Sequence, residues 1–186
     1  MGTSKALVDL RGKSFLAHIL EATRHPKIGV TRVVLGFGDD EIRRMLHLPD
    51  EIVILNPDWE RGQLSSIQAA VRALSEDPLA GDAIDGMLLW PVDHPLVNRA
   101  VVDSLIDAFE YLAQPIVIPT FNGRRGHPTI FARSLFPELL LASDDLGARS
   151  VVWEHAADVA EVPTEEEGVV LNLNDPEALF RAQNEE

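Results

Sequence analysis

Short apolar runs of strand length alternate with segments of helical periodicity along this chain of 186 residues, and this alternation most constrains its fold. The runs are rich in Val, Ile and Leu, whereas the other segments repeat their apolar residues every three or four positions. Strands joined by helices normally lie parallel in one sheet. The pattern therefore predicts an α/β fold with a mostly parallel central sheet and helices on both faces. Ligands of such folds bind at the carboxyl ends of the strands.

The expected elements have definite positions. Strands are predicted at 30–35, 52–55, 84–90, 115–119 and 129–131, with weaker ones at 159–162 and 169–173. Helices are predicted around the apolar residues of 15–22, 42–46, 67–74, 101–109, 135–141, 148–155 and 177–181. We expect Ser14 and Asp39 to cap the first two helices.

Length, composition and charge exclude several classes of protein. A chain of this length forms one domain, which we expect to span 1–186. The absence of cysteine excludes disulfides, a cysteine nucleophile and cysteine-ligated metal clusters. Because 30 acidic residues outweigh 16 basic ones, the net charge of −14 disfavours a nucleic-acid partner. An anionic substrate would need a local basic pocket or a bridging metal.

The sequence also lacks the patterns of a membrane protein. Its longest apolar runs, such as 87–92, fall far short of the roughly 20 residues that a membrane-spanning helix needs. Residues 1–5 precede an amphipathic stretch and lack the hydrophobic region of a signal peptide. We therefore expect a cytoplasmic protein without a membrane partner.

An acidic residue follows the most apolar predicted strand directly. Asp93 stands in the segment Pro91-Val92-Asp93-His94-Pro95, where its side chain would point into the ligand crevice. A carboxylate at this position can bind a divalent cation that carries phosphates. The alternative is that Asp93 forms a turn or caps the helix expected near Asn98.

A second polar segment, 56–66, links a strand to a helix. Gly62 permits a tight turn, and the hydroxyls of Ser65 and Ser66 at the helix start can donate to an anion or to the edge of a base. Asn56 opens the segment. An ordinary capping turn explains the same pattern slightly better when the segment is taken alone.

Two arginines make a local positive site in this acidic chain. Arg124 and Arg125 lie between glycines in 122–128, and guanidinium groups suit phosphate oxygens. The pattern alone fits a polar hairpin loop somewhat better. His127 could act as a general base, although a lone loop histidine is more often structural.

Two further positions carry possible ligands. Asn174 could supply a second oxygen to a metal at Asp93, but capping of the last helix by Asn174 or Asp175 is the simpler interpretation. Lys5 is the cation of the opening turn. Exposed lysines are usually only solvated, yet this one lies where a phosphate would bind.

Six short motifs follow one another along the chain. They are G-K-S-F-L at 12–16, N-P-D-W-E-R-G-Q-L-S-S at 56–66, V-D-H-P at 92–95, G-R-R-G-H-P at 123–128, G-A-R at 147–149 and N-L-N-D-P-E at 172–177. In this order they resemble the MobA-like nucleotidyltransferases, and most closely the molybdenum-cofactor cytidylyltransferase branch. The resemblance extends from residue 1 to about residue 181.

The resemblance implies a fold, a reaction and a set of roles. The implied fold is Rossmann-like with three layers, as in nucleotide-diphospho-sugar transferases. The implied reaction is Mg²⁺-dependent transfer of a nucleoside monophosphate from an NTP, with CTP favoured, to a phosphate-bearing acceptor such as molybdopterin cofactor, releasing pyrophosphate. Lys5 would neutralise the triphosphate, and Asp93 with Asn174 would hold the metal. Other implied contacts are Asn56, Gly62, Ser65 and Ser66 to the nucleotide, and Arg124, Arg125, Gly126, His127 and Pro128 to the acceptor.

Two departures from the family pattern matter. The family opens with a central strand and a glycine-rich loop that wraps the triphosphate, whereas this sequence starts within that loop. We expect an open strand position in the sheet, and we interpret Met1 as a mis-assigned start. Asn172 and Asn174 replace the usual acids, so we expect weaker metal binding. The alternative function is a non-catalytic relative that binds a nucleotide or cofactor.

Overall fold

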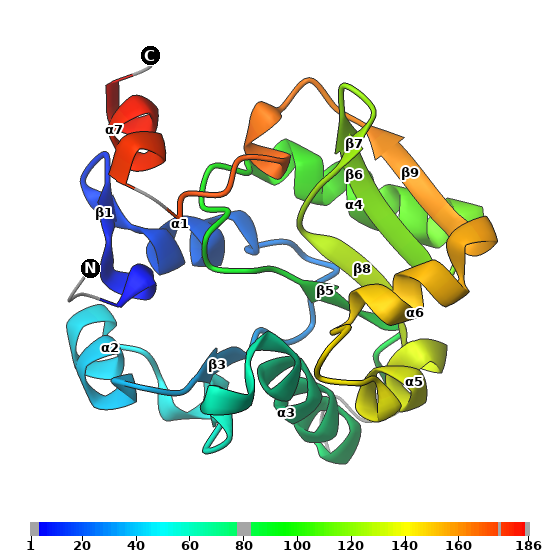
Figure 1. Ribbon diagram of the computed structural model, residues 1–186, viewed down its shortest axis with the longest axis horizontal. Helices are drawn as coiled ribbons and strands as arrows, with labels where there is room; N and C mark the ends of the chain where they lie inside the picture. The colour runs from blue at the N-terminus through cyan, green and yellow to red at the C-terminus, as the bar shows by residue number, and fades with distance from the viewer. Residues whose placement is uncertain (1–3, 78–82, 175, 185–186) are drawn as a thin grey trace.

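The computed structural model describes residues 4–77, 83–174 and 176–184, which form three layers with a sheet between helices (Figure 1). No helix in these ranges is long and apolar enough to cross a membrane. The Rossmann-like α/β class expected from the sequence is confirmed.

The first part of the sheet contains two short parallel strands. β3 (Val33–Leu35) pairs with β4 (Val53–Leu55). A separate antiparallel hairpin forms from β1 (Asp9–Leu10) and β2 (Lys13–Ser14) near the start of the described chain.

The second part of the sheet is larger and mixed. Its strand order is β5 (Gly86–Leu89), β8 (Thr129–Ala132), β6 (Ile116–Phe121) and β7 (Arg124–Arg125). β9 (Val159–Pro163) pairs with β6 in parallel, whereas β8 runs antiparallel to both β5 and β6.

The antiparallel strand β8 corrects the expectation of a mostly parallel sheet. A parallel neighbour needs a crossover of a dozen or more residues, usually with a helix. The chain between β6 and β8 holds only the hairpin turn and β7, so β8 must return antiparallel. At this turn Asn122 and Gly123 have φ angles of +50° and +75°, the backbone that tight hairpins favour.

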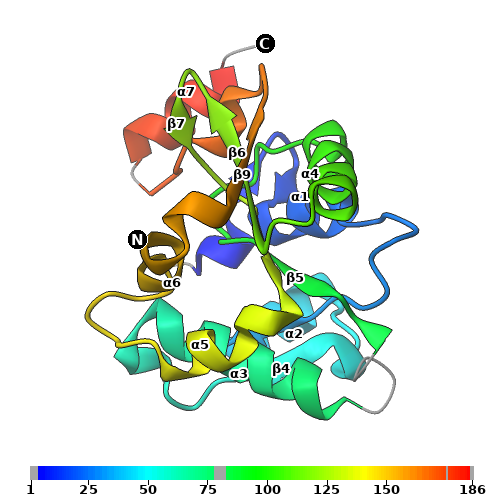
Figure 2. The ribbon, with the colours of Figure 1, turned by 90° about the vertical axis from the view of Figure 1, so that its right-hand side faces the viewer.

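Helices cover both faces of the sheet, as Figures 1 and 2 show from two directions. Each amphipathic segment expected from the sequence forms a helix. In chain order they are α1 (Phe15–Ala22), α2 (Asp39–Leu46), α3 (Gln63–Glu76), α4 (Arg99–Leu112), α5 (Phe136–Leu141), α6 (Arg149–Glu154) and α7 (Pro176–Asn184).

The helix starts partly follow the expected caps. Ser14 caps α1, since its side chain accepts a hydrogen bond from the amide three residues on. The N-cap of α2 is Gly38 with φ +75°, so the prediction that Asp39 caps this helix is wrong by one position. Asn98 itself caps α4 with its side chain, so Asp93 is not that cap.

Three predicted strands differ from the observed ones for reasons of pairing. The first and third are shorter than 30–35 and 84–90, because a ladder extends only as far as its partner and β4 and β8 are short. Segment 169–173 forms no strand. It is held instead by single bonds: Val169 O accepts from His127 N at 2.8 Å, and Leu173 N donates to Asp93 O at 2.9 Å.

The core lies on both faces of β6. Ile116 and Ile118 pack with buried residues of α3, α5 and α6. Val117, which points the opposite way, packs with Leu105 and other residues of α4. Alternation along β6, which is buried except at its last residue, therefore joins the three layers.

A cavity of about 1080 Å³ separates the two parts of the sheet. Residues 28–37 line it on the β3 side and 83–93 on the β5 side, and apolar residues of α1 and α3 close it. Among the described residues, β3 pairs only with β4, and β5 only with β8. The open strand position expected from the sequence is therefore present in the described part of the chain.

Candidate functional site

A carboxylate and an amine meet at the carboxyl end of β5. The Nζ atom of Lys5 lies 3.9 Å from Oδ2 of Asp93, and the two side chains are 44% and 18% exposed. The same amine donates a hydrogen bond to the side-chain oxygen of Asn174. The structure thus brings together three residues that the sequence analysis assigned to one phosphate and metal site.

The segment 170–174 passes beside Asp93 and holds this residue by two hydrogen bonds. The amide of Leu173 donates to the backbone oxygen of Asp93, and the Nδ2 atom of Asn172 donates to Asp93 Oδ2 at 2.9 Å. Sequence reasoning had treated Asn172 only as a replaced acid. Its amide donates to the Asp93 side chain, which an ionised acid in its place could not do.

Two histidines form a buried pair next to this carboxylate. The rings of His94 and His127 are 4.7 Å apart between centroids, and His94 Nε2 lies 4.0 Å from Asp93 Oδ1. Burial lowers the pKa of His127 to about 4, with the His94 ring as the second cause. Burial also lowers the pKa of His94, against the charge of Asp93. Both rings are therefore neutral near pH 7, and sequence reasoning did not anticipate His94.

The Nδ1 atoms of both rings are buried without a hydrogen-bond partner among the described residues. Neutral imidazole carries one donor and one acceptor nitrogen. Both nitrogens are shielded from solvent, and the two rings lie beside Asp93 without lining the cavity themselves.

The turn 56–66 is held by a buried amide–hydroxyl network. The Nδ2 atom of Asn56 donates to the hydroxyls of Ser65 and Ser66 at 2.8 and 3.0 Å, and its oxygen accepts from the amide of Asp58. Asn56 and Ser65 are 4% and 3% exposed, so they orient the turn. Ser66 lines the cavity together with Lys5 and Asp93. Gly62 supplies the positive φ angle of +97° before α3.

The arginine loop stands apart from the cavity. Arg124 and Arg125 are exposed on β7, do not line the cavity, and Arg125 pairs with Glu161 at 2.8 Å. The polar hairpin left open by the sequence is therefore what forms here. The following residues turn inward instead, since the His127 ring is buried against His94.

Gly126 lies against the backbone of Val169. A Cβ atom added there would be 2.3 Å from the carbonyl oxygen of Val169. We expect Gly126→Ala to lower the free energy of unfolding by about 2 kcal/mol, because a backbone oxygen cannot yield as a side-chain tip can. Urea unfolding of the variant checks this. Gly29→Ala is the matched control, since an added Cβ there meets nothing within 4 Å, and an equal loss in both variants would contradict the assignment.

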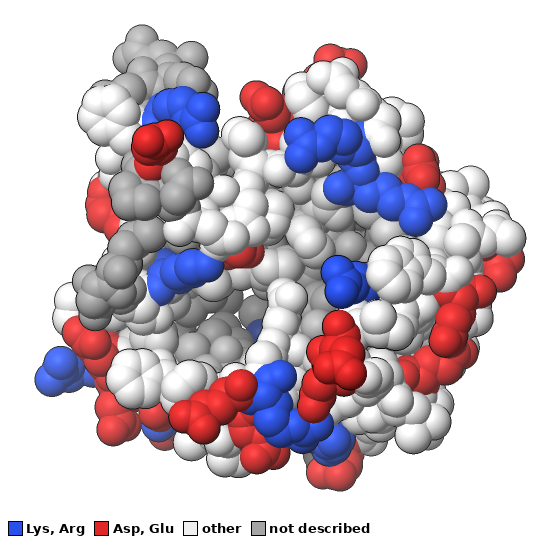
Figure 3. Space-filling view, in the orientation of Figure 1, with Lys and Arg blue, Asp and Glu red and all other residues white. Residues whose placement is uncertain are grey.

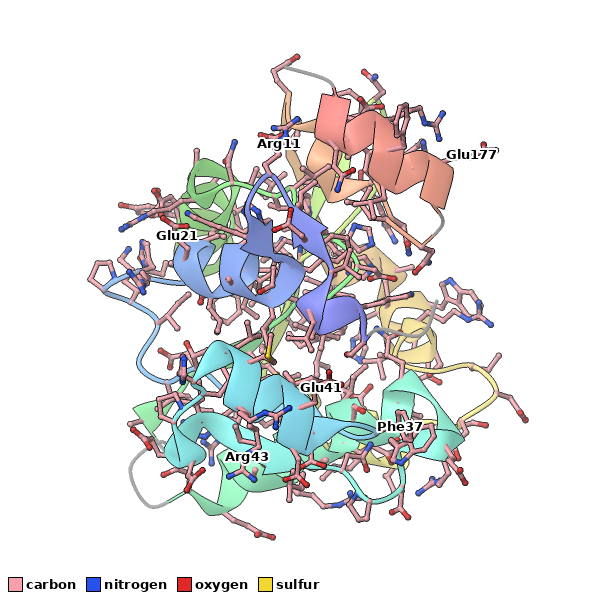
Figure 4. The ribbon with its side chains drawn as sticks, turned by 90° about the vertical axis from the view of Figure 1, so that its left-hand side faces the viewer. Arg11, Glu21, Phe37, Glu41, Arg43 and Glu177 are labelled. Carbon is pink, nitrogen blue, oxygen red and sulfur yellow. The ribbon has the colours of Figure 1, made fainter. Side chains whose placement is uncertain are left out.

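Two aromatic side chains stand at the surface beyond β3 and β4. The rings of Phe37 and Trp59 are 5.5 Å apart between centroids and tilted by 51°. Gly36 makes this approach possible, since a Cβ there would lie 2.4 Å from the Cβ of Trp59. Figure 4 shows Phe37 at the surface beside α2. Sequence reasoning missed both rings, although a phenylalanine between two glycines directly after a strand was a usable signal.

Charge along the cavity is balanced, whereas the whole chain carries a net charge of −14. The cavity is lined by the basic residues Lys5, Lys27 and Arg32 and by the acidic residues Asp85, Asp93 and Glu110. The face in Figure 3 is hollowed near its centre, with both basic and acidic side chains beside the hollow. An anion therefore meets less repulsion here than a surface of the average charge would give.

The donor set suits a cation that arrives with phosphates. Among the described residues, no group of three or more His, Cys, Asp or Glu side chains is placed to hold a metal. Asp93 offers one carboxylate, and Asn174 offers a neutral amide oxygen. Mg²⁺ usually binds through one or two carboxylates plus substrate phosphates and water, so these residues fit such an ion.

Comparison with known proteins assigns the family. Residues 1–159 match the family model of the MobA-like NTP transferase domain, and the chain belongs to this family. It is similar to the 3-deoxy-manno-octulosonate cytidylyltransferase of Trichlorobacter lovleyi, with 24% identity over 143 residues that cover 72% of this chain and 56% of the relative. The chain thus spans little more than half the length of this curated relative.

Solved structures share the fold. Rv0371c from Mycobacterium tuberculosis superposes with a TM-score of 0.75 and 22% identity, covering 100% of this chain and 92% of that one. The molybdopterin-guanine dinucleotide biosynthesis protein A of Archaeoglobus fulgidus has a TM-score of 0.65 and 22% identity, covering 98% and 90%. A further structure of Rv0371c is a complex with manganese, with a TM-score of 0.70 and 23% identity over 99% and 94% of the two chains.

Proposed function

We propose that this chain transfers a nucleoside monophosphate from an NTP, preferably CTP, to the phosphate of a molybdopterin-type acceptor. An acceptor phosphate oxygen attacks the α-phosphorus, the α–β phosphoanhydride bond breaks, and pyrophosphate leaves. The observation that carries the proposal is the contact of Lys5 with Asp93 at the carboxyl ends of the strands. The cytidylyltransferase relative and the family support it. We propose one domain, 1–186, acting in the cytoplasm.

No side-chain nucleophile is needed, because the acceptor phosphate is one already. The work of the protein is alignment and charge neutralisation, as in phosphoryl transfer generally. Lys5 would donate to the β- and γ-phosphate oxygens once its bond to Asn174 is exchanged. Asp93 and Asn174 would hold a divalent ion, for which the manganese complex of a fold relative is a precedent. When bound, such an ion supplies charge neutralisation at the phosphates.

The nucleoside would lie on the α3 side of the cavity. Gln63 and Ser66 at the start of α3 line the cavity, and Gly62 before them has a positive φ angle. Asn56 and Ser65 act as positioning residues, since their polar atoms bond to one another and to the turn.

The acceptor would approach from the side of the buried histidines. Gly126 lets the loop pack closely, and Pro128 follows it into β8. The neutral His127 ring would face the acceptor, while Arg124 and Arg125 would attract its phosphate from the surface. Each arginine is exposed enough to do so, although Arg125 must first leave Glu161.

Pyrophosphate release tests the function. The protein is incubated with Mg²⁺ or Mn²⁺, molybdenum cofactor, and CTP, GTP, ATP or UTP in turn. The proposal expects stoichiometric pyrophosphate with CTP above the other three. The second candidate, a non-catalytic binding relative, is favoured by the single carboxylate of the donor set. Nucleotide binding without pyrophosphate would support that candidate instead.

The amine of Lys5 carries a second test. We expect Lys5→Met to lower kcat/KM for pyrophosphate release about 100-fold, because a charge-assisted donor to the leaving phosphates is lost. Lys13→Met is the matched control, since Lys13 pairs with Glu21 on the surface of α1. Equal activity of the two variants would remove Lys5 from the mechanism.

A further inference from the structure

The exposed aromatic pair is not explained by the packing of the core. Phe37 is 79% exposed and Trp59 is 41% exposed. Neither belongs to the apolar clusters that make up the described core. Large apolar side chains gathered at a surface often mark a binding site.

The backbone around the two rings is fixed by hydrogen bonds and close packing. Trp59 lies in the turn 56–66, which is fixed by the bonds of Asn56 to Asp58 and to the serines of α3. The absent side chain of Gly36 lets the Trp59 side chain pack on the end of β3. The indole is therefore held in place before any ligand arrives.

One ring of the pair borders the proposed nucleotide site. Phe37 lines the same cavity as Lys5, Ser66 and Asp93. Trp59 does not line that cavity but contacts the Phe37 ring from the turn 56–66, so it supports Phe37 from the side. Figure 4 shows Phe37 at the surface.

We propose that Phe37, supported by its contact with Trp59, is the stacking surface for the nucleobase of the bound NTP. The inference rests on the proposed function, whose nucleoside side it completes. Every base presents a flat π-face to an aromatic side chain, so stacking adds affinity without choosing among bases. Base choice is then left to polar groups such as Ser66, which can reach the edge of the base.

A comparison of two anions separates the contribution of the base to affinity from that of the phosphates. The Kd values of CTP and of inorganic tripolyphosphate, each with Mg²⁺, are measured by calorimetry for wild type and for Phe37→Ala. We expect CTP to bind at least tenfold more weakly to the variant, the lower part of the range for loss of one base stack. Tripolyphosphate has no base and should bind both proteins within twofold.

Two further variants guard against a purely structural effect. Phe37→Trp keeps a π-face and should retain CTP binding. Tyr111→Ala removes another exposed ring, 83% exposed at the end of α4, and should change neither Kd. Circular dichroism confirms that each variant is folded.

Three outcomes would overturn the inference. CTP binding that is unchanged in Phe37→Ala means that the base lies elsewhere. Equal weakening of CTP and tripolyphosphate means that Phe37 only shapes the phosphate site. CTP binding that is weakened as much in Phe37→Trp as in Phe37→Ala means that a π-face at this position does not bind the base. If wild type binds neither anion, the proposed function itself fails, and this result is distinct from the other three.

Discussion

Asp93→Asn is expected to lower metal-dependent pyrophosphate release about 1000-fold, the largest effect on activity that the site predicts. The substitution keeps the shape of the side chain but removes the charge that faces Lys5 and would face a divalent ion. In the native protein, Asn172 Nδ2 donates to a carboxylate oxygen of Asp93. The substitution puts an amide group in place of that carboxylate. Loss of one electrostatic group of this kind lowers the rate about 10²- to 10³-fold. Asp93 has two such roles, because it contacts Lys5 and would also bind the divalent ion.

Asp145→Asn is the matched control for this prediction. Asp145 lies between α5 and α6, is exposed and does not line the cavity. The control should retain wild-type activity and unfold at the same urea concentration as wild type. Retention of full metal-dependent activity by Asp93→Asn would refute the metal and phosphate assignment.

Lowering the pH from 6.5 to 4 is expected to reduce the free energy of unfolding by about 3 kcal/mol through His127 alone. In the unfolded chain this histidine binds a proton below about pH 6.5, whereas burial in the fold lowers its pKa to about 4. Between these values the unfolded state holds more protons, so stability falls as the pH falls. The contribution is complete above pH 6.5 and lost once the pH reaches about 4.

The comparison that isolates this effect uses His127→Gln. Urea unfolding at several pH values should show a shallower pH dependence for the variant between pH 6.5 and 4, because the variant lacks the buried imidazole. The exposed Leu112 provides a control without a titratable group, and Leu112→Gln should show the pH dependence of wild type. Identical slopes for wild type and His127→Gln would show that the His127 ring is not buried in neutral form.

Local patterns sufficed for much of the fold. Long amphipathic helices such as α3 and α4 were predictable because their apolar residues recur at helical spacing. The hairpin at Asn122 and Gly123 was predictable because these residue types accept positive φ angles. Such features depend on a few neighbouring residues.

Pairing across long distances was not predictable from patterns. The antiparallel course of β8 depends on which strand it joins, and apolar runs carry no direction. Segment 169–173 has strand composition, yet its hydrogen bonds go to single loop atoms at His127 and Asp93. Strand propensity depends on the type of residue and does not indicate which strand or atom that residue will pair with.

In the candidate site, too, local features were predictable from the sequence and contacts between distant residues were not. The turn 56–66 was recognisable because its polar residues bond within the turn. The meeting of Lys5, Asp93 and Asn174 was reached only through a family resemblance, since it joins three distant parts of the chain. The His94–His127 pair escaped notice because burial, which makes both rings neutral, is a property of the packed fold.

Paramagnetic broadening by Mn²⁺ with CTP tests the central claim most directly, namely that the metal–triphosphate binds at Asp93 and Lys5. In a ¹⁵N-labelled sample, we predict selective loss of the amide signals of Asp93, His94 and Leu173, with the signals of α6 unchanged. Asp93→Asn should abolish the loss. Broadening centred on the acidic segment 165–167, or no broadening with CTP present, would contradict the account.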